Sequence, residues 1–117
     1  MYELDLIKST KLAKKLGGPP IFHDGFLHRV TVDKDIMTLD VKLLSQSNPL
    51  LKSDTNVLLK LNNIKRFTMS SRSIKNALLV IHDLDIRKVN DHLHLILEST
   101  DGTISEVEFE TIELIEA

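Results

Sequence analysis

Residues 37–43 have the sequence Met-Thr-Leu-Asp-Val-Lys-Leu, in which every second side chain is apolar. This alternation has the period of a β-strand with one face in a hydrophobic core and the other in water. Upstream, Val30 and Val32 alternate with polar residues in the same way. Residues 33–35 (Asp-Lys-Asp) are turn formers between the two segments. The sequence therefore predicts a β-hairpin at the start of a sheet.

The alternation returns after a polar loop at residues 45–54 and continues, with interruptions, to the end of the chain. Within residues 77–89 it changes phase at His82-Asp83, because Leu79 and Ile81 share one parity whereas Leu84 and Ile86 share the other. A one-residue shift would place the apolar side chains of half the strand on the solvent face of the sheet, so we predict a β-bulge there. Turn signals at residues 62–63, 90–91 and 101–102 connect the strands without helical crossovers.

The N-terminal segment has a different period. Leu4, Ile7, Leu12 and Leu16 recur at helical spacing, and the pairs Gly-Gly and Pro-Pro follow at residues 17–20. We expect a helix at residues 3–16, with an edge strand at residues 2–6 as the alternative. The 117 residues then form a single, mainly β domain. Its antiparallel β-meander, at residues 26–115, curls into a barrel or sandwich beside the short N-terminal helix.

The inward parity of these strands predicts one aliphatic core. Its expected members are Val30, Leu39, Val41, Leu59, Leu61, Leu84, Leu95, Leu97 and Phe109.

Composition narrows the possible functions. The chain has no cysteine, which excludes disulfides, thiolate metal sites and a cysteine nucleophile. It begins without a signal-peptide pattern and contains no stretch of about 20 apolar residues, so we expect a cytoplasmic protein without a membrane span. Four Phe, one Tyr and no Trp argue against a stacking surface for nucleic acid. We expect no cofactor and no bound metal.

Two His-Asp pairs are the first candidates for a site. In residues 22–25, Phe22-His23-Asp24-Gly25, the pair opens the first strand, and it recurs as His82-Asp83. The pairs could provide metal ligands or a proton shuttle, but adjacent residues of a strand point to opposite faces. We therefore interpret the first pair as a structural corner, in which Phe22 enters the core and Asp24 accepts backbone hydrogen bonds. The second pair belongs to the bulge.

Two further patterns lie near the end of the chain. His92 and His94 share one strand face, a spacing that can bind zinc, but with no third ligand of matching phase we interpret them as two half-exposed imidazoles on the wet face of a hairpin. Glu106, Glu108 and Glu110 also share one face, and residues 98–117 contain seven acids and no Lys or Arg. These glutamates protect an edge strand from pairing, or they form a contact surface for a basic partner.

Taken together, these residues resemble the bacterial immunity protein 50 family. The similarity begins with Leu-Gly-Gly-Pro-Pro-x-Phe-His-Asp at residues 16–24, although Gly25 stands where the family usually has Ala. It continues through residues 30–33, 39–43 and 59–64, and then through Leu84-x-Ile86, Leu93-x-Leu95, Gly102 and Phe109. The resemblance implies a protein that neutralises a toxin encoded beside it. It implies no catalytic residues.

The sequence thus leaves three hypotheses. The preferred one is a non-catalytic immunity protein that occludes its toxin, with Glu106, Glu108 and Glu110 as possible contact residues. The second is a small metal-binding or hydrolytic domain that uses His23, Asp24, His82 and Asp83. The third is a structural module that forms a homodimer through a strand edge.

Overall fold

The computed structural model describes residues 21–70 and 79–116 of the chain, which form an antiparallel β-sheet. The predicted N-terminal helix at residues 3–16 lies outside the described residues. Within these ranges there is no helix, and the strands are β1 (Phe26–Asp33), β2 (Ile36–Leu43), β3 (Thr55–Asn62), β4 (Arg66–Ser70), β5 (Leu79–Val89), β6 (His92–Ser99), β7 (Ile104–Phe109) and β8 (Thr111–Glu116). The mainly β, antiparallel prediction is confirmed.

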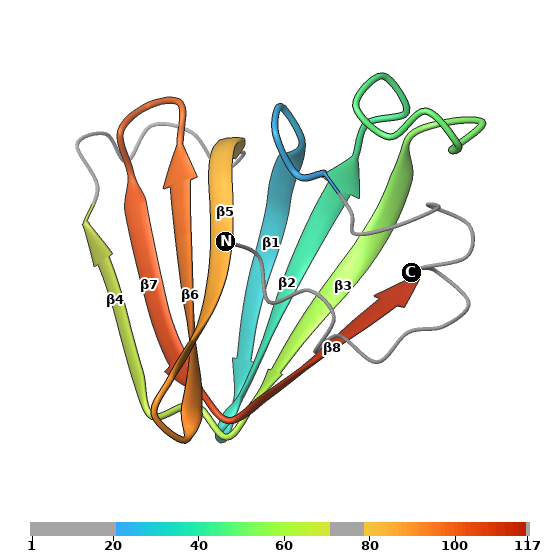
Figure 1. Cartoon of the computed structure of the whole chain (residues 1–117). Helices are drawn as coiled ribbons and strands as arrows, with labels where there is room; N and C mark the ends of the chain where they lie inside the picture. Colours follow the sequence, from blue (N-terminus) through green and yellow to red (C-terminus); the bar gives the residue numbers. More distant parts are fainter. Residues whose placement is uncertain (1–20, 71–78, 117) are drawn as a thin grey trace.

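The order of the strands in the sheet is β4-β7-β6-β5-β1-β2-β3-β8, and Figure 1 shows β4 at the left and β8 at the right. The first half of the sheet comprises β1, β2, β3 and β8, and the second half comprises β4, β5, β6 and β7. The halves meet where Phe26 and Leu27 of β1 pair with Val80 and Leu79 of β5. Because β4 and β8 are the two ends of the sheet, it is not closed into a barrel, and the barrel prediction is wrong.

The chain passes between the halves at a second place, where β3 leads into β4 and β7 leads into β8 (Figure 1). The two connections run antiparallel and are hydrogen bonded. The Glu110 amide donates to the Asn62 carbonyl at 2.9 Å, and the Lys65 amide donates to the Glu108 carbonyl at 2.7 Å. At these connections the chain bends from one half to the other, so β4 pairs with β7 while β8 pairs with β3. This leaves β4 and β8 unpaired with each other at the two ends of an open sheet.

The core lies on one face of the sheet. Phe22, Phe109, Leu59, Leu84 and Leu95 are at most 1% exposed and belong to one cluster of buried apolar residues that draws on both halves. Eight of the nine predicted core residues are buried. Val30 is the exception, with 37% of its surface exposed. It pairs with buried Leu39, so its parity was predicted correctly, but β1 no longer pairs with β5 at this position.

The central strands β5 and β1 each contain one irregularity of register. The register of β5 against β6 shifts between Ile81 and Asp83, which confirms the predicted bulge at His82. A second shift between Leu27 and Arg29, in β1, was not predicted. The hairpin turns contain Lys34 and Asn90 in the left-handed region, at φ 56° and 58°. These single left-handed residues allow tight reversals between the paired strands.

Candidate functional site

The Phe22–Gly25 segment forms a tight corner that attaches the start of β1 to β5. The side chain of Phe22 is fully buried, and its carbonyl accepts the Gly25 amide at 2.9 Å. Asp24 has a φ of 65°, and its amide donates to the Ile81 carbonyl at 2.8 Å. The corner therefore holds the start of β1 against β5, and the predicted burial of Phe22 is confirmed.

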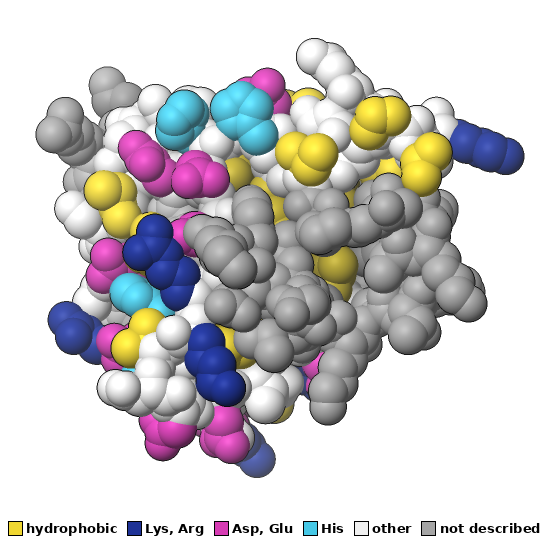
Figure 2. Space-filling view, in the orientation of Figure 1, with side chains coloured by type: hydrophobic (Ala, Val, Ile, Leu, Met, Phe, Trp, Pro, Cys, Tyr) yellow, Lys and Arg dark blue, Asp and Glu magenta, His cyan; other side chains and the backbone are white. Residues whose placement is uncertain are grey.

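The corner brings His23 and His82, one residue from each His-Asp pair, together, although they lie far apart in the sequence. The rings of His23 and His82 are 5.6 Å apart at an angle of 65°. Nδ1 of His23 lies 2.6 Å from the carbonyl oxygen of His82, which requires the tautomer that carries a proton on Nδ1. Nε2 of His23 is 3.5 Å from Oδ1 of Asp24. Figure 2 shows two neighbouring histidine side chains beside acidic ones near the top of the molecule.

The role predicted for the Asp24 carboxylate is wrong. Among the described residues no backbone amide donates to this carboxylate, because the left-handed backbone of Asp24 turns the side chain toward His23 and solvent. Its side chain is 52% exposed. The Asp24 amide, rather than its carboxylate, attaches the corner to β5.

The remaining histidines do not join this cluster. Nδ1 of His92 is 3.4 Å from Oδ1 of Asp91 in the β5–β6 turn, and His94 pairs across the sheet with Arg87 and Glu108. Asp83 pairs with Glu98. Within residues 21–70 and 79–116, no group of three or more acidic or histidine side chains is arranged to hold a metal ion.

Glu106 and Glu108 lie on the outer face of the second half, opposite buried Val107. Glu106 is flanked by Thr68 and Ile96, and Glu108 by Arg66 and His94. Both glutamates are half-buried. Arg66 lies beside Glu108 from the edge strand β4, so the acidic strand has a basic neighbour from a distant part of the sequence. Side-chain pairing across strands supplies a cation that the local sequence does not contain.

The carboxylates of three neighbouring strands share this outer face. In cross-strand rows, Asp85 pairs with Ile96 and Ile96 with Glu106, while Asp83 pairs with Glu98 and Glu98 with Ile104. We define the acidic face as Asp83, Asp85, Glu98, Glu106 and Glu108, with Ile96 and Ile104 between them. Ile104 is 42% exposed.

Arg87 stabilises the charged carboxylate of Asp85 at the margin of the acidic face. Its Nε lies 2.6 Å from Oδ2 of Asp85, whose side chain is only 16% exposed. Burial alone would raise the pKa of Asp85, but the hydrogen bond from Arg87 and nearby positive charge lower it below the usual value. The carboxylate is therefore ionised at neutral pH. Figure 2 shows acidic, basic and histidine side chains intermixed on the side of the molecule where β4 to β7 lie.

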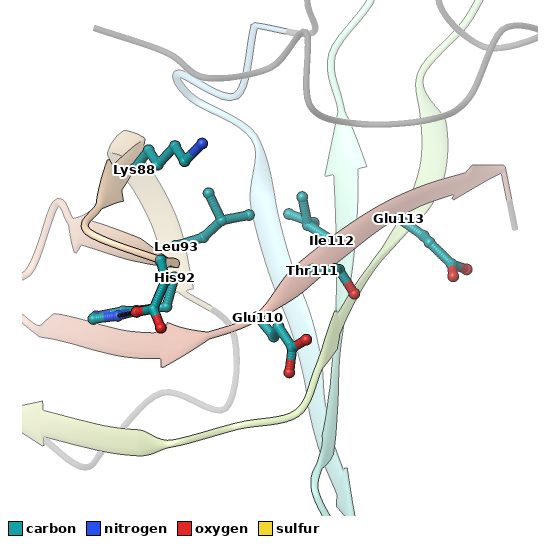
Figure 3. Close-up of a pocket in the computed structure, with 8 residues that line it drawn as sticks. Lys88, His92, Leu93, Glu110, Thr111, Ile112 and Glu113 are labelled. Carbon is teal, nitrogen blue, oxygen red and sulfur yellow. Dashed lines mark hydrogen bonds and ion pairs between the residues drawn. The ribbon is translucent and has the colours of Figure 1, made fainter.

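Glu110 lies at the bend between β7 and β8 and is separate from the other two predicted glutamates. Its Oε2 atom accepts a hydrogen bond from Asn63 Nδ2 at 2.9 Å. It also lines a pocket of about 470 Å³ between the β5–β6 turn and the start of β8 (Figure 3). Leu93 and Ile112 point toward each other across this pocket.

The rest of the pocket lining is polar and mostly acidic. Lys88, Asp91 and His92 contribute from the β5–β6 turn, and Glu110, Thr111 and Glu113 contribute from the opposite segment. In Figure 3 Lys88 lies on the far side of Leu93 from Glu110, and Glu113 points away from the centre. The hydrogen bond with His92 lowers the pKa of Asp91, so this carboxylate is charged at neutral pH.

Sequence reasoning missed two features that depend on distant contacts. The first is the pocket, whose lining residues are ordinary turn residues when seen in the sequence alone. The second is Asn48, which is 4% exposed and exchanges hydrogen bonds with the backbone of Ile21 at 2.9 and 3.0 Å. The Asn48-Pro49 pair signals a turn, but nothing near it indicates that the amide holds the loop against the segment before the corner.

Comparison of the chain with protein families, with characterised proteins and with solved structures finds no match. In the part of the chain that the structure describes, no helix is long and apolar enough to cross a membrane.

Proposed function

We propose that this chain is a non-catalytic binding protein that neutralises a protein toxin by covering it, and that the acidic face is its contact surface. The single observation that carries the proposal is the composition of that face. Five carboxylates and two isoleucines occupy one side of three adjacent strands, β5, β6 and β7. Exposed apolar side chains among carboxylates that outnumber the neighbouring Arg66 and Arg87 are suited to a partner with a basic, partly apolar surface.

The resemblance of residues 16–24 to the immunity protein 50 family supports the same reading. In such a mechanism the sheet is a preformed surface, and occlusion requires no reacting group on this chain. The rigid pairing of β5, β6 and β7 keeps the carboxylates in place before the partner arrives, which reduces the entropy lost on binding. The acidic field accelerates the encounter with a basic protein.

The test is binding kinetics against the protein encoded by the adjacent gene, at two salt concentrations. We expect Glu106→Gln/Glu108→Gln to lower the association rate at low salt, and the difference from the wild type to shrink at high salt, because salt screens exposed charges. Asp33→Asn/Asp35→Asn is the matched control, since it removes two charges from the β1–β2 turn on the other half of the sheet.

Equal association rates for the glutamine variant and the control would contradict the role of the acidic face. Absence of any binding to the adjacent gene product would contradict the proposed function itself. Circular dichroism of each variant checks that the sheet is intact.

A further inference from the structure

The pocket between the β5–β6 turn and the start of β8 is distinct from the acidic face, but it is continuous with it. Glu108 pairs with His94 on the outer face of the sheet, and the next positions along the same two strands are Glu110 and His92, which line the pocket. A protein that covers the acidic face would therefore reach the pocket at one end of its contact area.

The pocket combines an apolar base with a polar rim that carries more negative than positive charge. Leu93 and Ile112 are 6% and 3% exposed, so they form a well-packed base rather than mobile surface groups. The rim includes the carboxylates of Asp91 and Glu110 and the single ammonium of Lys88, whereas the carboxylate of Glu113 points away from the centre. Volumes of about 300–1,000 Å³ are typical of ligand pockets, and the 470 Å³ measured here falls in that range.

The hydrogen bond from Asn63 to Oε2 restricts the Glu110 carboxylate at the pocket wall. Lys88 lies on the other side of the apolar base in Figure 3, so a bound cation is favoured at the Glu110 end and disfavoured at the Lys88 end. The site thus suits a flat cation on an aliphatic stem. The stem would cover Leu93 and Ile112, and the cation would meet the carboxylates.

We propose that this pocket binds an arginine side chain of the partner protein and acts as the anchor of the interface. The proposal rests on the proposed function for the identity of the partner. A guanidinium suits the site better than an ammonium, because it is more weakly hydrated, pairs with carboxylates through a planar fork and stacks on rings such as that of His92. Arginine is enriched among the few residues that contribute most of the binding energy of protein interfaces.

The experiment titrates the full chain with N-acetyl-arginine methylamide and follows the methyl and amide NMR signals. We expect saturable shifts at Leu93, Thr111 and Ile112. N-acetyl-citrulline methylamide has nearly the same shape without the charge and should cause no saturable shift, and the lysine analogue should bind more weakly. Glu110→Gln should weaken arginine binding about fivefold, as expected for one charge-assisted hydrogen bond at a partly exposed site. Asp54→Asn, just before β3 and outside both the pocket and the acidic face, should leave it unchanged.

Equal shifts with the citrulline analogue, shifts located elsewhere, or equal affinities for Glu110→Gln and Asp54→Asn would each overturn the arginine site. The result is independent of the toxin test, since it needs no partner protein. If the adjacent gene product binds but Glu110→Gln does not change the affinity, the anchor is wrong and the proposed function stands. If the arginine probe binds but the gene product does not, the pocket stands and the proposed partner is wrong.

Discussion

At the scale of single residues, Gly25 is the position where the backbone leaves least space. A Cβ atom built there would lie 2.6 Å from the carbonyl oxygen of Lys42 and 2.9 Å from that of Phe22. Both are backbone atoms, which cannot move aside as a side chain can.

We predict that Gly25→Ala lowers the free energy of unfolding by about 1–3 kcal/mol, the usual cost of forcing atoms into a filled site. Urea denaturation followed by circular dichroism measures the change. Asp24→Gly is the control, since glycine adopts the φ of 65° readily, and its stability should stay within about 0.5 kcal/mol of the wild type. A fully stable Gly25→Ala variant would mean that β2 can shift away from the corner and make room for the Cβ atom.

At the scale of elements, β1 differs from its neighbour β2 in how much of its inner side is covered. Val30 and Leu39 are directly paired, yet Val30 is 37% exposed and Leu39 only 4%. The pairing of β1 with β5 is confined to Phe26 and Leu27, so the remaining part of β1 has a strand neighbour on one side only among the described residues.

This difference predicts unequal effects of two similar truncations. Leu39→Ala should cost about 2–5 kcal/mol, because it leaves a cavity in the core. Val30→Ala should cost less than about 1 kcal/mol, because its side chain is already in contact with water. Thermal and urea unfolding of the two variants compares them directly, and similar losses would show that Val30 is covered in solution.

The elements that the sequence predicted are those that local patterns determine. The strands around residues 37–43 and 93–97 alternate with period two, and the phase change at His82 requires a bulge whatever the partner strand is. The open sheet was not predictable in this way, because it depends on the bend at which β7 gives way to β8. The same holds for the site: the structural corner follows from residues 22–25, whereas the meeting of His23 and His82 is a contact across 59 positions.

At the scale of the whole molecule, the two halves share one core although only two residue pairs join β1 to β5. Leu59 of β3 and Leu95 of β6 belong to the same buried cluster. Separating the halves would therefore expose apolar surface on both. The second connection, through residues 62–65 and 108–110, adds hydrogen bonds that also cross between the halves.

We predict that the two halves unfold together. In native-state hydrogen exchange, the most protected amides of β3 and of β6 should give the same free energy of opening, equal to that of global unfolding. An opening energy that is clearly lower for one half would contradict this and would identify the halves as separate cooperative units. Measurements at several low urea concentrations distinguish global from local opening.

The pairing of β8 with β3 has a consequence for the order in which the molecule assembles. β3 ends at Asn62, but its outer neighbour, which covers Leu59 and Leu61 with the paired residues Leu114 and Ile112, begins only at Thr111. During synthesis on the ribosome, the edge of β3 thus stays unpaired until some fifty further residues have been added to the chain. Such long-range contacts slow folding, and a nascent chain exposes this strand edge until its last strand emerges. A chaperone that shields exposed strands would act in that interval.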